Sequence, residues 1–333
     1  MLSRFTIAIP LVLSLVAFVL SNLCLFAGRD KGFMEDYAIA RLNTSMLGHS
    51  LLASESSSSS SDDDNDDDGL FEDLKDKWNE VKDDIIDEIN NVTSQIVDEW
   101  AEALGIAEWY SLHVVNVCEG YYKGNATNKN AGLNITHCTK ARVDFNVSEM
   151  LNKELSIGPV DLSLADLGWS DEINDALDNL NDALLGLFIV YLVAIIASGI
   201  AMIGCVAALV LFRPHLSPRD TLINSRWAKV NSFLASLAAM SVFTGSVIVT
   251  VTADKAIKKL NRYGDDVGVS ATKGNKFRAL SWTAVAFAVT ASLYWMAHKY
   301  LIKRQQRREW TERKANNDSP ARGNSHEMTN VRA

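Results

Sequence analysis

The stretch LFIVYLVAIIASGIAMIGCVAALVLF, residues 187–212, decides the fold of this chain. It contains no Asp, Glu, Lys or Arg, and it is longer than the roughly 20 residues that cross the hydrocarbon core of a bilayer as a helix. A buried helix of a soluble protein normally keeps a polar face, which this stretch lacks. The sequence therefore predicts a transmembrane helix over residues 187–212.

Three further apolar stretches without Asp, Glu, Lys or Arg accompany it, at 5–27, 230–252 and 279–297. We expect spans at 5–27, 187–212, 230–252 and 279–302. Small residues recur in them at i, i+4 spacing, as at Ala194 and Ser198 or at Ala284 and Ala288. Small side chains let membrane helices approach closely. The pattern predicts a compact bundle but leaves the pairing of its helices open.

The first stretch, 5–27, has two interpretations, a cleaved signal peptide and a retained anchor. Arg4 alone marks a charged region before it, and the stretch exceeds the about 7 to 15 apolar residues of a signal peptide. Leu25 and Ala27 also make a poor small-x-small cleavage site. We expect a retained helix, with residues 1–4 in the cytosol.

The long segment between the first two spans, 28–186, has the marks of an extracellular loop. Cys118 and Cys138 both lie in it, whereas Cys24 and Cys205 lie inside spans. If the loop lies outside the cytosol, the first pair is expected to form a disulfide. Clustered glycosylation sequons support that side, at Asn43, Asn91, Asn125, Asn134 and Asn146.

Charge bias supports this orientation with one conflict. The segment 213–229 and the tail 303–333 are basic, so both are expected in the cytosol, as are both chain termini. The loop 253–278 must then be extracellular, although it is also basic. We give the sequons and cysteines more weight than the basic charge of this loop. The net charge of -9 comes mainly from acidic residues in 28–186.

Within the extracellular segment, residues 54–68 form a Ser/Asp run that is too polar to pack and is expected to be disordered. The run resembles the start of a calcium loop, but Lys75 stands where that loop needs Glu. Apolar residues at helical spacing predict an amphipathic helix over 70–104, which either packs on its own domain or docks a neighbour. We favour packing within the domain.

Residues 109–122, WYSLHVVNVCEGYY, are rich in aromatic and β-branched residues and predict a strand. A second strand-like alternation follows at 141–147, and a helix is predicted over 170–186 with Ser170 as its cap. Two histidines, His113 and His137, are candidates for a metal or pH site. Isolated histidines more often serve packing, and we favour that interpretation. The predicted fold class is an all-α four-helix transmembrane bundle with a mixed α/β, disulfide-bridged extracellular domain between spans one and two.

The same residues narrow the function. Pumps, ion-coupled transporters and voltage sensors place charges inside the membrane, and the four apolar stretches, which end at 297 in the last span, have none. A channel or transporter is thus disfavoured, although a neutral pore stays open as an alternative. The chain has no motif of a hydrolase, metalloprotease or nucleotide-binding enzyme. We expect no enzymatic activity, no cofactor, no metal and no nucleic-acid partner.

Four strings give the chain a wider resemblance: LGIAEWYSLHVVNVCEGYY (104–122), Cys138, DLGWSDEINDAL (166–177) and RYGDDVGVSATKGNKFRALSWTA (262–284). Together with the order of spans they resemble the fungal Sur-seven/PalI family of claudin-like tetraspan proteins. The likeness runs from about residue 70 to the last span and includes the first. The Ser/Asp run does not resemble a family feature.

The resemblance implies a role in static plasma-membrane patches of the cell cortex, the eisosomes, and in cell-wall integrity and stress responses. Cortical or eisosome proteins, membrane lipids, cell-wall components and a second copy of the chain are the implied partners. The PalI branch implies the alternative, an accessory of ambient-pH signalling. Its members have long low-complexity tails, whereas about thirty residues follow position 302 here.

The basic tail offers a possible lipid contact of its own. Trp310 lies among cations that either bind anionic lipids of the inner leaflet or simply fix the orientation of the last span. These cations are Lys303, Arg304, Arg307, Arg308, Arg313 and Lys314.

Overall fold

The computed structural model describes residues 2–47, 106–123, 132–140, 149–150, 152–153, 170–211, 218–265 and 267–318. The expected Ser/Asp run, the amphipathic helix over 70–104 and the alternation at 141–147 lie outside these residues. So do the sequons at Asn91, Asn125 and Asn146.

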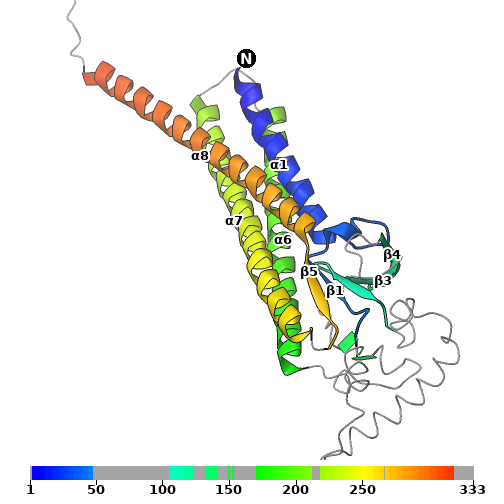
Figure 1. The fold of residues 1–333 in the computed structure, drawn as a ribbon. Coiled ribbons are helices and arrows are strands. Elements are labelled where there is room, and N and C mark those ends of the chain that lie inside the picture. Colours follow the sequence, from blue (N-terminus) through cyan, green and yellow to red (C-terminus); the bar gives the residue numbers. More distant parts are fainter. Residues whose placement is uncertain are drawn as a thin grey trace, which may run out of the picture.

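Four long helices lie side by side, and a small sheet sits at the end of the bundle away from the N-terminus (Figure 1). Each of the four contains an apolar window long enough to cross a membrane. The closest contacts join α1 to α6, α6 to α7, α7 to α8 and α8 back to α1, which makes a closed ring. The helices are α1 (Leu2–Phe26), α6 (Asp171–Leu211), α7 (Pro218–Tyr263) and α8 (Asn275–Asp318).

The small residues that predicted close packing lie where the helices meet. Ala194, Ala201 and Ala284 are fully buried, and a Cβ on Gly245 would come within 3.4 Å of the Tyr191 ring. Large apolar side chains instead cover the outside of the ring, among them Ile196, Ile203, Phe233, Met240 and Leu293. An apolar exterior around small, buried contacts is the pattern of a bundle solvated by lipid.

The helices extend beyond the apolar stretches that predicted them. The helix expected at 170–186 is confirmed and runs without a break into the second span, with Ile173, Leu177 and Leu184 buried. The expected cap is wrong in its chemistry. The Ser170 carbonyl accepts the N–H of Ile173 at 3.0 Å, whereas the Ser170 hydroxyl is buried without a hydrogen bond. The backbone thus begins this helix without the side chain.

The helices α7 and α8 also continue past their predicted spans. α7 includes much of the segment 213–229 and the first part of 253–278, and α8 continues through the basic tail to Asp318. In Figure 1 this last part of α8 projects beyond the other three helices, at the end where the N-terminus lies.

The sheet has five antiparallel strands in the order β4-β3-β2-β1-β5. Four come from the segment between the first two spans, and β5 comes from the segment between the last two. β5 pairs with β1 along its whole length, from Ala40 opposite Lys273 to Asn43 opposite Ser270. The strands are β1 (Ala40–Asn43), β2 (Trp109–Leu112), β3 (Val117–Lys123), β4 (Gly132–Cys138) and β5 (Ser270–Lys273).

The prediction of one strand over residues 109–122 is wrong, because the segment folds back as a hairpin of β2 and β3. The N–H of His113 donates to the carbonyl of Asn116 at 2.9 Å and closes the turn. Val114 and Val115 at the tip are 1% and 3% exposed, because the tip inserts into the main core. Turns are usually recognised in a sequence by Gly, Pro, Asn, Asp or Ser. The tip of this hairpin is apolar and has high strand propensity, so the sequence predicted one continuous strand.

Candidate functional site: the sheet and its disulfide

One face of the sheet seals the end of the bundle. Leu42, Tyr110 and Leu112 are at most 1% exposed and share one hydrophobic core with Leu180, Leu184 and other helix residues. The Tyr110 hydroxyl accepts the N–H of Ala107 at 3.0 Å, so the buried ring keeps its polar end satisfied. Sheet and helices are therefore one packed body.

The opposite face carries a second, smaller core around Trp109, which is 1% exposed. The Trp109 ring packs with Cys118 and Ile135, and the Arg41 guanidinium lies 5.6 Å from its centre. Gly120 lies opposite Trp109 at a bulge in β3, and a Cβ there would come within 2.1 Å of the Asn134 carbonyl oxygen. Only glycine fits this crossing of three strands.

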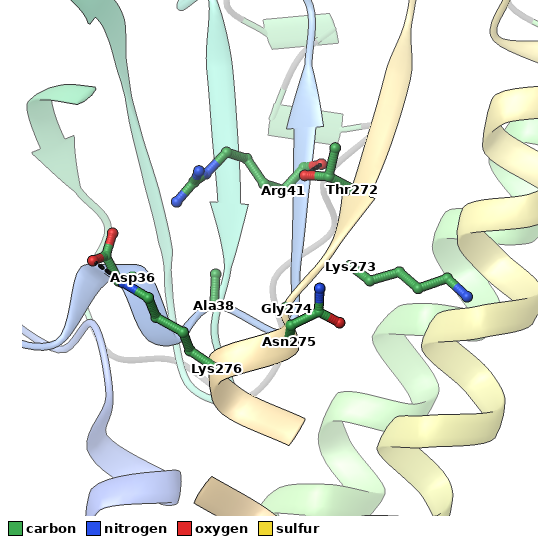
Figure 2. A pocket seen from close by; sticks show the side chains of 8 residues that line it. All are labelled: Asp36, Ala38, Arg41, Thr272, Lys273, Gly274, Asn275 and Lys276. Atoms are coloured by element: carbon green, nitrogen blue, oxygen red, sulfur yellow. Dashed lines mark hydrogen bonds and ion pairs between the residues drawn. The ribbon is translucent and has the colours of Figure 1, made fainter. Parts of the chain in front are cut away.

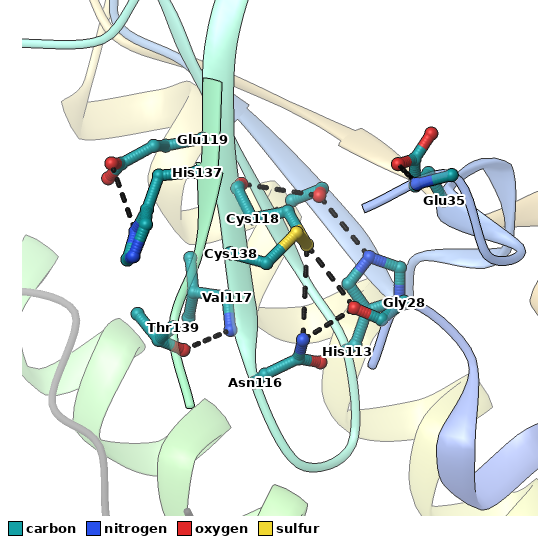
Figure 3. Close-up of a disulfide and its surroundings, with 12 residues drawn as sticks. Gly28, Glu35, His113, Asn116, Val117, Cys118, Glu119, His137, Cys138 and Thr139 are labelled. Carbon is teal, nitrogen blue, oxygen red and sulfur yellow. Dashed lines mark hydrogen bonds and ion pairs between the residues drawn. A yellow bond between two sulfur atoms is a disulfide. The ribbon is translucent and has the colours of Figure 1, made fainter. Parts of the chain in front are cut away.

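The predicted disulfide is confirmed between Cys118 and Cys138, with sulfurs 2.04 Å apart (Figure 3). The two cysteines are direct partners in the β3–β4 register, so the bond joins neighbouring strands. Thr139 extends the pairing, because its hydroxyl accepts the N–H of Val117 at 3.0 Å. The remaining cysteines of the chain, Cys24 and Cys205, are buried free thiols.

The disulfide also borders the point where the chain leaves the first span. The Cys118 sulfur lies 3.3 Å from the Gly28 carbonyl oxygen, and the Asn116 side chain donates a hydrogen bond to the same oxygen. Gly28 has a φ of 74°, and a Cβ on it would lie 2.4 Å from the His113 ring. Glycine alone allows this contact, which fixes the hairpin turn to the end of α1.

The two histidines that were candidates for a metal or pH site, His113 and His137, have different surroundings. His113 is fully buried, with Nε2 3.3 Å from the Ser111 hydroxyl, whereas His137 is exposed and lies 3.4 Å from Glu119. Burial, and secondarily the charge of Arg41, lowers the pKa of His113 to about 4. His113 is thus a neutral packing residue. Within the described ranges, no three His, Cys, Asp or Glu side chains gather as a metal site.

Two of the predicted glycosylation residues fall within the sheet, in unlike positions. Asn134 and Thr136 are both exposed on the edge strand β4. Asn43 lies in β1, where its side-chain oxygen accepts the hydroxyl of Ser45 at 2.7 Å, and Ser45 is 1% exposed. In the folded chain, Asn134 is the accessible acceptor of the two.

The basic loop 253–278, which conflicted with the charge bias, has several of its cations in ion pairs. Lys273 lies 2.8 Å from Asp254, and Lys276 lies 2.6 Å from Asp36 in the first loop. Lys259 reaches Asp175 at the start of α6 at 3.7 Å. Lys276 and Lys259 therefore connect the two loops that share the sheet, whereas Lys273 pairs within its own loop, and all three have a structural role.

The six tail cations lie on the projecting part of α8 and are all exposed. Lys303, Arg307, Trp310 and Lys314 follow the i, i+4, i+7, i+11 spacing of one helix face. Lys314 lies 5.5 Å from the centre of the Trp310 ring, which is itself 66% exposed. We call these four residues the basic stripe.

Sequence reasoning missed the residues that anchor the sheet to the helices. Gly28, Asn116 and Gly120 carried no motif of their own, and the strands β1 and β5 were not predicted. A glycine two positions after Cys118, and one at the exit of the first span, were the available signals.

A family model described as the SUR7/PalI family matches residues 6–294. No curated protein and no solved structure gives a significant match. The matched range includes the first three candidate spans, the first half of the fourth, all five strands of the sheet and both bridged cysteines. This chain is therefore a multi-pass membrane protein that belongs to the SUR7/PalI family.

Proposed function

We propose that this chain is a non-catalytic plasma-membrane protein that organises cortical membrane domains of the eisosome type and contributes to cell-wall integrity and stress responses. In this proposal both termini lie in the cytosol and the sheet faces the cell wall. Family membership supports the proposal. The alternative within the same family is an accessory of ambient-pH signalling.

The observation that carries the proposal is that β1 and β5 join the two loops on the same side of the bundle. Asn261 fixes β5 to the end of α7, because its side chain exchanges hydrogen bonds with the backbone of Ala271 at 2.6 and 3.0 Å. Lys276 and Asp36 pair across the same two loops. A sheet that is fixed to the helix bundle in this way keeps one shape. Such a rigid surface suits a protein that binds neighbouring proteins at the cell cortex.

A fluorescent fusion of the full chain in its host cell tests this function. We expect immobile puncta at the cell cortex, and a deletion strain that is sensitive to cell-wall stress. A deletion strain with normal wall resistance and a defective response to alkaline pH would favour the signalling alternative. A fusion confined to internal membranes would contradict both.

The orientation is supported by the disulfide, since such bonds persist in oxidising compartments. We expect Asn134→Gln to remove one glycosidase-sensitive mobility shift of the native protein. Asn43→Gln is the matched control and is expected to leave mobility unchanged, because the Asn43 side chain is half-buried and hydrogen-bonded to Ser45. Native protein whose mobility is insensitive to glycosidase would contradict the extracellular placement.

The basic stripe supports a contact of the tail with anionic lipids of the inner leaflet. It places cations beside Trp310, while Glu309 and Glu312 lie on the opposite side of the helix. Membrane-proximal cations contribute about 1 kcal/mol each. Replacing Lys303, Arg307 and Lys314 by Gln should weaken vesicle binding of a tail peptide on the order of 100-fold.

The matched control replaces Arg304, Arg308 and Arg313 by Gln, which removes the same charge from positions around the rest of the helix. We expect a smaller loss, because Arg304 and Arg308 lie away from Trp310 and only Arg313, three residues after it, is its neighbour. Equal losses would show that net charge alone acts. A wild-type peptide that ignores anionic vesicles at low salt would leave the cations only the role of fixing the orientation of the span.

A further inference from the structure

Two adjoining hollows lie on the sheet beside the start of α8, and Arg41 and Asp36 line both. Figure 2 shows the first of them. The first, of about 250 Å³, is lined further by Thr272, Asn275 and Lys276. The second, of about 480 Å³, continues past Glu35 and Tyr37 to β4. The two hollows therefore form one groove that shares Arg41 and Asp36, with Lys276 lining only the first part and Glu35 only the second.

Arg41 is the cation of this groove without an ion pair among the described residues. Lys276 is paired with Asp36 at 2.6 Å, and Lys273 points away to Asp254 at 2.8 Å (Figure 2). Arg41 is partly buried against Trp109, and its Nε has no hydrogen-bond partner. The Asp36 carboxylate acts on Arg41 only at a distance, because it pairs with Lys276. A partly desolvated guanidinium without a direct ion pair is costly, and its fork of N–H donors fits an oxyanion.

Further donors surround the same hollow. Thr272 lies directly opposite Arg41 in the β1–β5 register, and its hydroxyl donates to the Arg41 carbonyl at 3.5 Å, a long hydrogen bond that a phosphate oxygen would replace. The Asn275 side-chain oxygen accepts from Arg278 at 3.1 Å, which leaves its amide N–H groups to donate. Asn275 also begins α8, so the unpaired N–H groups of the first helical turn lie here. Asp36 does not oppose an anion strongly, because Lys276 neutralises it and lowers its pKa.

The second hollow contains the acidic side chain of Glu35 in place of the Thr272 and Asn275 donors of the first. Glu35 lies there with no cationic partner among the described residues, and its carboxylate accepts the backbone N–H of Gly32. Tyr37 lines the same hollow. A carboxylate beside an aromatic ring suits an ammonium group.

The groove lies at the depth of lipid headgroups. Arg278 is the last charged residue before the apolar part of α8, and Trp282, 40% exposed, follows one turn later. Exposed tryptophans concentrate at the membrane interface. Asn275 is four residues before the predicted span at 279, which is about 6 Å along a helix. The interfacial layer on each side of the hydrocarbon core is about 5 to 7 Å thick.

We propose that this groove binds a phospholipid with a zwitterionic headgroup from the leaflet on the sheet side. Its phosphate lies against Arg41, Thr272 and Asn275, and its ammonium group lies toward Glu35. The inference needs the bundle to span a membrane, and it is independent of any cortical role.

Native mass spectrometry of the purified full chain tests the proposal, with phosphatidylcholine and phosphatidylglycerol of equal chain length as probes. We expect one retained phosphatidylcholine, bound more tightly than phosphatidylglycerol. Arg41→Gln should weaken that binding more than tenfold, and Arg41→Lys should weaken it less. Lys31→Gln, which removes an exposed cation outside the groove, should bind as the wild type does.

Two further measurements keep the test decisive. Thr272→Val changes an exposed side chain, so a loss of binding with an unchanged melting temperature excludes misfolding as its cause. Titration with glycerophosphocholine and with inorganic phosphate separates a headgroup site from a free-phosphate site. Arg41→Gln binding that equals the wild type would overturn the proposal. Inorganic phosphate binding as tightly as the lipid would overturn its lipid source, and equal affinity for phosphatidylglycerol would overturn the role of Glu35.

Discussion

The hydrogen bonds of the bundle and those of the sheet differ in how far apart their partners lie in the sequence. In the bundle, most hydroxyls bond to their own helix, as Ser198 does to Ala194 and Thr250 to Ser246, four residues back. In the sheet, Asn116 reaches Gly28 and Thr44 reaches Ala107, contacts that join distant parts of the chain. The helices are thus locally self-sufficient, whereas the sheet exists only when segments from both loops assemble.

We expect the largest loss of stability, confined to the sheet, when the disulfide is removed. Cys118→Ala with Cys138→Ala opens a covalent loop of 20 residues. The chain-entropy model then gives a loss of about 3 kcal/mol in the free energy of unfolding the sheet. Proteolysis and far-UV circular dichroism should show a sheet that opens while the helical signal stays. Cys24→Ala, which removes a buried thiol of the bundle, should leave proteolytic resistance of the sheet intact.

The second test crowds the sheet without touching its covalent bond. Gly120→Ala places a Cβ within 2.1 Å of the Asn134 carbonyl. Overpacking of this kind costs about 1 to 3 kcal/mol, and here it should separate β4 from β3. Gly186→Ala is the control, since nothing lies within 4 Å of a Cβ there. A Gly120→Ala variant as stable as the control would contradict the close approach.

Acid should act on the sheet in a similar way. His113 has a pKa of about 4 in the fold and an ordinary value of 6.5, so the folded state binds fewer protons between these values. Stability is therefore complete above pH 6.5 and declines as the pH falls toward 4, by about 2 kcal/mol at pH 5. Thermal unfolding followed across this range measures the slope. His113→Gln should flatten it, and a slope unchanged by that substitution would assign the acid sensitivity to other groups.

The smallest effect is expected in the bundle. Tyr191 contacts the hydroxyl of Ser281 at 2.7 Å, and Ser281 also contacts Ser246. Tyr191→Phe removes one interhelical hydrogen bond, and such bonds contribute about 0.6 kcal/mol in membrane proteins. Unfolding in detergent should show this small loss with the sheet unchanged. A loss larger than that of Gly120→Ala would reverse the contrast between the two regions.

The sequence by itself determined the four spans, the helix that begins near Ser170 and the bridged pair Cys118 and Cys138. Spans are readable because every backbone group in lipid must be satisfied within its own helix, so local composition suffices. The family resemblance was also confirmed, over residues 6–294.

Only the tertiary structure decided the sheet. The hairpin at His113 to Asn116 has an apolar tip that inserts into the core, and β5 comes from a short polar segment of the last loop. Neither segment carries a pattern that marks its partner, because strand pairing depends on contacts between residues far apart in the chain. The groove at Arg41 exists for the same reason, since the second loop supplies Thr272 and Asn275 while the first supplies Arg41 and Glu35.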